Sequence, residues 1–277
     1  MNCQWERLLA LLPQPIAAEA DKLGRDTLQE LRLRLHNAVE GNLGHRQVYF
    51  KHTVTANDLT YILNAASRYS PWQAETLAKG YVTAQGGHRI GVCGEVVTHR
   101  GTVQGIRNVD SLCIRVARDF PGIGNSFLDL QHSLLVLGPP GYGKTTLLRD
   151  IARTIGQTET VAVVDEREEL FPPGFLRGKR MDVLRLCPKA AGVDMALRTL
   201  GPAWIAVDEI TEESDCDAIL RCANCGVKLL ATAHGSSLGD LKRRPVYRKL
   251  LEADVFPNVV IMQKDKSFVW ERKELWK

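Results

Sequence analysis

The sequence lacks any apolar run long enough to cross a bilayer. Stretches such as SLLVLG and WIAV are far shorter than the roughly 20 residues that a transmembrane helix needs. The first apolar run, residues 8–12, follows Glu6 and Arg7 and precedes two prolines, which makes a poor signal peptide. We therefore expect a cytoplasmic protein.

A disulfide or zinc pattern is lacking as well. The seven cysteines are an odd number spread along the chain, which disfavours a disulfide framework. Cys216, Cys222 and Cys225 lie close together in CDAILRCANC, but no second cysteine pair or paired histidine motif accompanies them. We interpret them as buried thiols of a helix, with a zinc site as the alternative.

A strong charge of either sign is also missing. The formal net charge is +4 over 277 residues, which by itself does not indicate nucleic acid. The apolar fraction of 44% suits a globular protein that buries a sizeable core. The length predicts one large domain or two ordinary ones.

Residues 1–120 mix helix and strand patterns and predict a smaller α+β domain. The alternation in LRLRL predicts a strand, and SLCIRVAR predicts another. Residues 54–84 predict two helices, the first capped by Thr55 or Asn57. Residues 86–108 predict a hairpin that turns at HRGT.

A linker is predicted between this part and the rest of the chain. Residues 118–127 concentrate Pro, Gly, Asn and Ser, and we extend the linker to about residue 130. In residues 131–277, unbroken apolar strand patterns alternate with helix patterns, and VVIMQKD with SFVWERKELW predicts a closing hairpin. This alternation predicts an α/β domain whose parallel sheet is covered on both faces.

The most specific motif is a phosphate-binding loop. GPPGYGKTT fits GxxxxGK[ST] and stands between a predicted strand and a predicted helix. Glycines let the backbone N–H groups face a β-phosphate, and the helix start adds its positive end. We expect Lys144 to reach the β- and γ-phosphates and the Thr145 hydroxyl to ligate Mg²⁺. The candidate nucleotide-binding residues are Gly138, Pro139, Pro140, Gly141, Tyr142, Gly143, Lys144, Thr145 and Thr146.

An acidic pair ends the strand pattern WIAVDEI. Asp208 is expected to hold Mg²⁺ through a water, and Glu209 lies where ligands of open parallel sheets bind. An acid in this place can polarise an attacking water, which favours a hydrolysing motor over a kinase. The alternative is a solvated acidic pair.

Two further strand patterns end in polar residues. TVAVVDE ends in Asp165 and Glu166, with Glu169 just beyond, and these acids can position water or Mg²⁺ unless they form a solvated turn. LLATAHG ends in Thr232 and His234, and a polar residue there can sense a γ-phosphate, although a lone histidine is more often structural. In the sequence, TVAVVDE lies between the loop strand and the Mg²⁺ strand. An extra strand between those two resembles the topology of the RecA-like and AAA-type motors.

These motifs resemble a known group of proteins. In order, GPPGYGKTT, VVDEREE, WIAVDEITE and ATAHGSS resemble the Walker A, Asp-box, Walker B and His-box motifs of type II/IV secretion ATPases. GGHRIGVCGEVV, IRVAR and DVLRLCPKA resemble, more closely, the stage III sporulation protein AA family, over nearly the whole chain.

Two departures from the secretion-ATPase pattern stand out. Those ATPases usually carry Gly-Glu where this chain has Asp208 and Glu209, and Glu-Asp where it has Asp165 and Glu166. Which carboxylate aligns water and which holds Mg²⁺ therefore stays open.

The resemblance implies a RecA-like P-loop domain that binds ATP and Mg²⁺ in a homo-oligomeric ring, a hexamer with nucleotide between subunits. It implies integral-membrane channel subunits as partners and a place at the inner face of a membrane, on the mother-cell side of a channel to the forespore. In such ATPases, arginines of the amino-terminal domain complete the neighbour's site. The candidates are Arg89, Arg107, Arg115 and Arg118, with Arg89 and Arg115 preferred, and which of them act stays open.

Three functions are compatible with these residues. The leading hypothesis is an ATP-hydrolysing motor in which Glu209, Glu166 and His234 serve catalysis. The alternative is a nucleotide-switched nucleic-acid-binding protein, since LKRRPVYRK is basic and holds one aromatic, although a solvated helix face accounts for that run better. A scaffold that uses ATP only to stabilise a ring is the third, and Glu209 argues against it because a scaffold needs no water-activating carboxylate.

Overall fold

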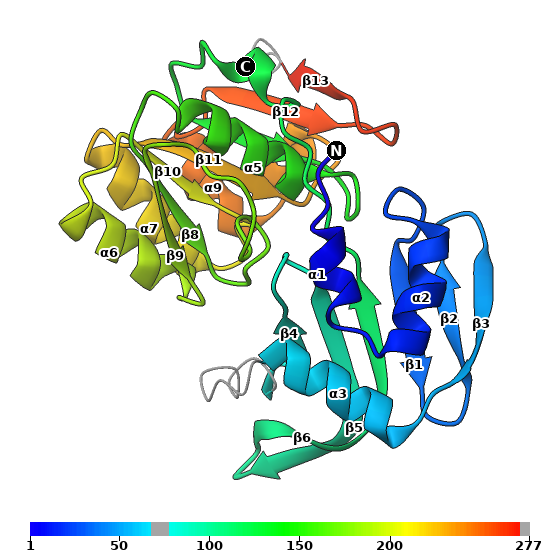
Figure 1. Cartoon of the computed structure of the whole chain (residues 1–277). Helices are drawn as coiled ribbons and strands as arrows, with labels where there is room; N and C mark the ends of the chain where they lie inside the picture. Colours follow the sequence, from blue (N-terminus) through cyan, green and yellow to red (C-terminus); the bar gives the residue numbers. More distant parts are fainter. Residues whose placement is uncertain (68–77, 272–277) are drawn as a thin grey trace. The chain divides into compact units, whose positions relative to one another are not determined.

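The computed structural model describes residues 1–67 and 78–271, and the chain divides into two compact units (Figure 1). Unit 1 comprises Met1–Asp119 with Pro172–Phe175, and unit 2 comprises Phe120–Phe171 with Leu176–Lys277. Within the described ranges, no helix has the length and apolar character to span a membrane.

Unit 1 is built on an antiparallel sheet of six strands in the order β3-β2-β1-β6-β5-β4. Its strands are β1 Glu30–Arg34, β2 Ala38–Asn42, β3 Gln47–Thr53, β4 Tyr81–Thr83, β5 Arg89–His99 and β6 Thr102–Arg115. Its helices are α1 Trp5–Leu9, α2 Gln14–Leu23 and α3 Ala56–Ser67. The sequence patterns do not indicate β2 and β3.

The core of unit 1 follows from strand alternation. In β1, Leu31 and Leu33 are buried while Arg32 and Arg34 between and after them are exposed, as LRLRL predicts. The two leucines stand opposite apolar residues of β6 and pack into one cluster with buried residues of the three helices.

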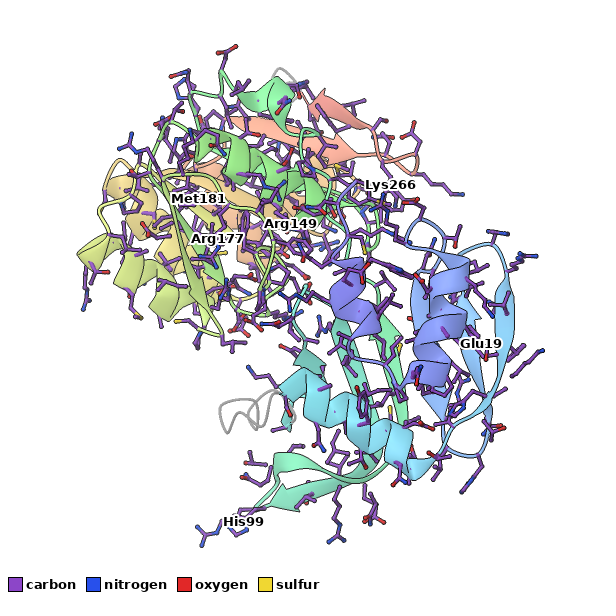
Figure 2. All side chains as sticks on the ribbon, viewed as in Figure 1. Glu19, His99, Arg149, Arg177, Met181 and Lys266 are labelled. Atoms are coloured by element: carbon purple, nitrogen blue, oxygen red, sulfur yellow. The ribbon has the colours of Figure 1, made fainter. Side chains whose placement is uncertain are left out.

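The predicted hairpin is confirmed, with one correction. β5 and β6 are joined at Arg100 and Gly101, which both have positive φ, and Figure 2 shows His99 at the far end of this hairpin. SLCIRVAR does not form a separate strand, because β6 continues without a break from Thr102 to Arg115.

Helix α3 begins with a reciprocal cap. The Thr55 hydroxyl accepts from the Asp58 N–H, and the Asp58 carboxylate accepts from the Thr55 N–H. Thr55 rather than Asn57 is therefore the cap. The second helix predicted within residues 54–84 lies mainly outside the described residues, but the end of that range is not helical, because Tyr81–Thr83 form strand β4.

Unit 2 is built on a seven-stranded sheet in the order β13-β12-β7-β11-β10-β8-β9 (Figure 1). All neighbours are parallel except β12 and β13, which form the predicted closing hairpin. The strands are β7 Leu134–Leu137, β8 Val161–Asp165, β9 Met181–Arg185, β10 Trp204–Val207, β11 Lys228–Ala233, β12 Asn258–Met262 and β13 Phe268–Glu271. The helices are α5 Lys144–Ile155, α6 Lys189–Thr199, α7 Glu213–Asn224, α8 Leu238–Lys242 and α9 Pro245–Glu252.

Each face of this sheet has its own core, which explains the unbroken apolar strands. Alternate residues of one strand enter different clusters: Leu135 and Leu137 pack with α6, α7 and α9, whereas Leu134 and Val136 pack with α5. A strand buried on both faces needs apolar residues at every position. The predicted α/β fold is confirmed, and β9 at the sheet edge is a strand that the sequence patterns did not indicate.

The predicted linker is anchored at both ends. Asp119 forms two backbone hydrogen bonds with Asn2, of 2.7 and 2.8 Å. The N–H groups of Gly122 and Gly124 donate to the buried Asp150 carboxylate of α5 at 2.8 and 2.7 Å. A Cβ at Gly124 would lie 2.6 Å from the backbone nitrogen of Ile151, so only glycine fits this close approach.

A buried histidine ties three segments of unit 1 together. His88 is 0% exposed; its Nδ1 accepts from the Ala117 N–H at 3.2 Å and its Nε2 donates to the Gln4 carbonyl at 3.1 Å. Burial lowers the pKa of His88 from its ordinary 6.5.

We predict that His88 makes the chain less stable in acid. Between the lowered folded pKa and 6.5, the unfolded chain holds one proton more, so the free energy of unfolding falls as pH falls through this window, by at most about 1.4 kcal/mol per pH unit. Urea unfolding of the wild type and of His88→Gln at several pH values measures how the free energy of unfolding depends on pH. The glutamine amide can keep a donor and an acceptor without titrating, so equal pH slopes for both chains would contradict the prediction.

Candidate nucleotide-binding site

The loop between β7 and α5 has the backbone of an anion site. Gly143 precedes the first helical residue with φ 96°, in the left-handed region that favours glycine. At Gly138 a Cβ would lie 2.9 Å from the Cβ of Met262, so a side chain does not fit. The loop thus leads directly into the N-terminus of a twelve-residue helix, where backbone N–H groups and the helix dipole favour phosphate.

Lys144, His234 and Glu209 form a connected chain of side chains. The buried Lys144 ammonium donates to the Pro139 carbonyl at 3.1 Å and to His234 Nδ1 at 3.0 Å. Since an ammonium only donates, Nδ1 carries no proton, and Nε2–H faces Glu209 Oε1 at 3.0 Å. Burial lowers the pKa of Lys144, against the opposing effect of the negative charges of Glu209 and Asp208.

A second chain connects Thr145, Asp208 and Thr232. The Thr145 hydroxyl donates to Asp208 Oδ2 at 3.0 Å, and the fully buried Thr232 hydroxyl donates to Asp208 Oδ1 at 2.7 Å. The Thr232 hydroxyl oxygen also accepts from the Glu209 N–H at 2.9 Å. Thr232 therefore fixes both acids that end β10.

Glu209 has an uncommon backbone. Its φ is 35°, a region that costs a non-glycine residue conformational energy. The contact of its N–H with Thr232 and a second one with Asp208 Oδ1 at 3.1 Å hold it there. Such strain persists where the surroundings determine the backbone, and functional sites are common among such places.

The strand order brings these residues together. β11 lies between β7 and β10, in a register that sets Ala233 beside Leu137 and Ala231 beside Val207. The carboxyl ends of the loop strand, the histidine strand and the acidic strand are therefore neighbours. The strand between the loop strand and the Mg²⁺ strand is thus β11, whereas β8 lies on the far side of β10.

The two acids that end β8 differ in their surroundings. The buried Asp165 carboxylate accepts from the backbone N–H groups of Glu169, Leu170 and Phe171, at 2.8, 3.1 and 2.8 Å. Burial raises the pKa of Asp165, and these N–H groups oppose the rise. Asp165 therefore shapes the turn, while the Glu166 side chain is one-third exposed and its Oε2 lies 3.1 Å from Lys189 Nζ.

The predicted arginines lie in unit 1. Arg89 and Arg115 stand opposite each other on β5 and β6. The Arg89 guanidinium lies 4.0 Å from the centre of the Tyr81 ring, and Arg115, 71% exposed, lies 3.6 Å from Glu30. Their part in a neighbouring subunit's site stays a prediction.

The other two arginines have local partners. Arg107 pairs with Glu95 at 2.9 Å on the hairpin. Arg118 donates to the backbone carbonyls of Arg25 and Leu28 at 3.1 and 2.8 Å, so its guanidinium fixes the segment before β1.

Two residues of the basic run 241–249 form hydrogen bonds within unit 2. Tyr247 is buried and its hydroxyl donates to the Ile210 carbonyl at 2.6 Å, so its ring does not offer a stacking surface. Arg244 donates to the His234 carbonyl at 2.8 Å and to Asp240 at 3.0 Å.

The clustered cysteines lie on and after α7. Cys216 and Cys222 are buried, as interpreted, and burial raises the pKa of each to about 12. Cys225 follows the helix and is exposed. The interpretation as buried thiols is thus right for two of the three residues.

An apolar cavity of about 520 Å³ adjoins the loop. It is lined by Phe120, Ile123, Gly141, Gly143, Thr146, Leu147, Met262, Lys266, Ser267 and Phe268. Its volume suits a small organic ligand such as a nucleotide base. Lys266, labelled in Figure 2, donates to the Gly141 carbonyl and lies 5.6 Å from the centre of the Tyr142 ring; a lone lysine in a turn gave no signal in the sequence.

The donor set near Asp208 suits magnesium. The Thr145 hydroxyl and the Asp208 carboxylate are hard oxygen donors, and Mg²⁺ at nucleotide sites takes few protein ligands besides phosphates and waters. In the part of the chain that the structure describes, no group of three or more His, Cys, Asp or Glu could hold a metal ion.

This combination defines the class of protein: an α/β protein with the fold of the secretion and pilus ATPases and a glycine-rich loop between β7 and α5. The solved structure of the pilus retraction motor PilT with bound ADP is 17% identical with a TM-score of 0.64, over 89% of this chain and 76% of PilT. The ATPase DotB of Legionella pneumophila is 16% identical with a TM-score of 0.61, over 94% of this chain and 81% of DotB.

The sequence comparisons are more specific. The family model "Sporulation stage III, protein AA" matches residues 4–269. Stage III sporulation protein AA of Bacillus subtilis (strain 168) is 39% identical over 259 residues, which cover 87% of this chain and 84% of that protein. The chain belongs to the stage III sporulation protein AA family.

We predict that Thr232 is needed for the order of the acidic pair. Thr232→Val keeps the shape but leaves the Glu209 N–H and an Asp208 oxygen without this partner, which is expected to lower the free energy of unfolding by about 1–3 kcal/mol. Thr232→Ser, which keeps the hydroxyl, is the matched control. Urea unfolding measures both, and equal stability of the two variants would contradict the prediction.

Proposed function

We propose that the chain is an ATP-hydrolysing motor. The observation that carries the proposal is the connected set at the carboxyl ends of β7, β11 and β10. One chain runs from Lys144 through His234 to Glu209, and the other from Thr145 through Asp208 to Thr232. The likeness to solved ATPases supports the fold, and the PilT structure contains ADP.

Each residue has a chemical role in the proposal. Lys144 and the loop N–H groups bind the β- and γ-phosphates and stabilise the charge that develops on them. Glu209 accepts a proton from the attacking water, whose oxygen bonds to the γ-phosphorus as the bond to the bridging oxygen breaks. His234 donates to Glu209 and thereby orients its carboxylate. Thr145 and Asp208 would hold Mg²⁺, which neutralises phosphate charge when it is bound.

The apolar cavity provides a place for the adenine base. It adjoins the loop glycines, and Ile123, Met262 and Phe268 supply apolar surface to it. ATP spanning the loop and the cavity would place its base in this cavity and its phosphates at the start of α5.

The proposal for the assembly and its location rests on the family resemblance. We propose a ring, a hexamer, in which Arg89 or Arg115 completes the neighbour's site, at the inner face of a membrane beside integral-membrane channel subunits. The channel would join mother cell and forespore. The exposed side chain of Arg115 supports a contact in trans.

We predict that Lys144→Ala abolishes ATP hydrolysis and that Glu209→Gln slows it by about 10²–10⁴-fold while ATP still binds, since a general base contributes this much. Phosphate release and the mass in solution are measured together, with and without ATP and Mg²⁺. Glu159→Gln is the matched control, because Glu159 pairs with Lys228 before β8 begins. Hydrolysis by Glu209→Gln at the wild-type rate would show that Glu209 is not the general base.

We also predict that Ile123 contributes to nucleotide affinity. Ile123 is 43% exposed, so Ile123→Ser should leave folding intact, and the loss of its contact with a base should raise the Kd for ATP by about tenfold. Leu128→Ser is the control, since Leu128 is exposed and does not line the cavity. Titration with a fluorescent ATP analogue measures the affinity; the same Kd in both variants would exclude the cavity as the base site.

A further inference from the structure

A lysine of DVLRLCPKA, to which the sequence analysis gave no chemical role, lies beside the acidic strand ends. Lys189 is the first residue of α6, directly after Pro188, and it is 9% exposed. A cation at this position meets the positive end of the helix dipole, and its burial removes water. Both effects disfavour the ammonium, so the acids around it must compensate.

The Lys189 ammonium contacts two loops. Its Nζ lies 3.1 Å from Glu166 Oε2, after β8, and 3.4 Å from Asp215 Oδ2, at the start of α7. It also lies 3.5 Å from the Thr211 hydroxyl, two residues after Glu209. Lys189 therefore connects the loop that carries Glu166 to the loop that carries Glu209.

Asp215 also binds the backbone of the loop that carries Glu209. Its Oδ2 accepts from the N–H groups of Thr211 and Glu212 at 3.1 and 3.2 Å. The same oxygen thus faces the ammonium and holds the loop directly after Glu209. Removing the ammonium would leave a carboxylate that is 6% exposed without its cation.

A small cavity lies among these groups. It has a volume of about 20 Å³, and Glu166, Lys189, Asp208, Glu209 and Thr211 help to line it. This volume suffices for about one water molecule, and the lining supplies polar partners. Arg167 also lines the cavity but is exposed, whereas Lys189 is buried.

We propose that Lys189 is a positioning residue for hydrolysis: it holds the Glu166 carboxylate at the cavity that Asp208 and Glu209 also line, and it fixes the Glu209 loop through Asp215. This inference rests on the proposed ATPase function. Lys189 does not need to touch the nucleotide, so it acts on turnover rather than on binding.

The test compares steady-state ATP hydrolysis by the full chain and three variants. Lys189→Met removes the charge, Lys189→Arg keeps it, and Lys228→Met is the matched control. Lys228 pairs with Glu159 at 3.2 Å in the same unit, but at the amino end of β11 rather than at a carboxyl end. Melting temperature and the affinity for a fluorescent ADP analogue are measured on the same samples.

Lys189→Met is expected to lower kcat by about tenfold or more, the scale on which outer partners of a site act. KM and the affinity for the ADP analogue should stay within about threefold, since a positioning residue acts on the transition state. Lys189→Arg should recover part of kcat, and Lys228→Met should match the wild type. An unchanged kcat in Lys189→Met, or a loss confined to KM and affinity, overturns the inference.

Two outcomes separate this inference from the function on which it rests. A wild-type chain that binds the ADP analogue without turnover, also in its assembled form, refutes the proposed function and the inference with it. If Lys189→Met melts below the assay temperature, Glu166→Gln decides, because it removes the positioned carboxylate while Lys189 keeps Asp215. A wild-type kcat in Glu166→Gln then overturns the inference.

Discussion

The position of β11 between β7 and β10 is the constraint on which the candidate site depends. Parallel strands in register end at one edge of a sheet, so the three strands deliver Lys144, His234 and Glu209 to the same place. Helices pack on both faces of the sheet, and for this reason β7 and β10 are apolar at every position, while β11 holds the buried Thr232 near its carboxyl end. The polar residues at their ends can then be held by neighbours rather than by water.

The buried charged side chains of the site each have partners that compensate their charge. Lys144 is buried, and its contacts are a carbonyl and a histidine nitrogen, with the negative charges of Glu209 and Asp208 nearby. Asp165 is buried as well, but three backbone N–H groups hold it. Lys189 is compensated by two carboxylates, those of Glu166 after β8 and Asp215 at the start of α7. Removing one partner of such a buried charge lowers the free energy of unfolding considerably, because the other charge is left uncompensated. These contacts therefore hold the side chains at this edge of the sheet in place.

The sequence anticipated the fold of each half to different degrees. The parallel sheet of unit 2 was predictable because its strands are short apolar runs between helices, and the hairpin around Arg100 and Gly101 because its turn chemistry is local. The edge strand β9 was missed because only Met181 among its residues is buried, which weakens its pattern. The sequence patterns divided β6 between the hairpin and SLCIRVAR because the polar residues Asn108 and Asp110 separate the two patterns, whereas β6 runs through both residues.

What the sequence determined by itself is the local chemistry: a glycine-rich loop before a helix, and acids or a histidine after apolar strands. Those signals need only a few consecutive residues. The tertiary structure alone decided which of these strand ends are neighbours, that Asp165 holds a turn while Glu166 faces Lys189, and that Thr232 fixes both acids of β10. The reason is that these contacts join residues distant in the chain, and strand order rather than local propensity sets them.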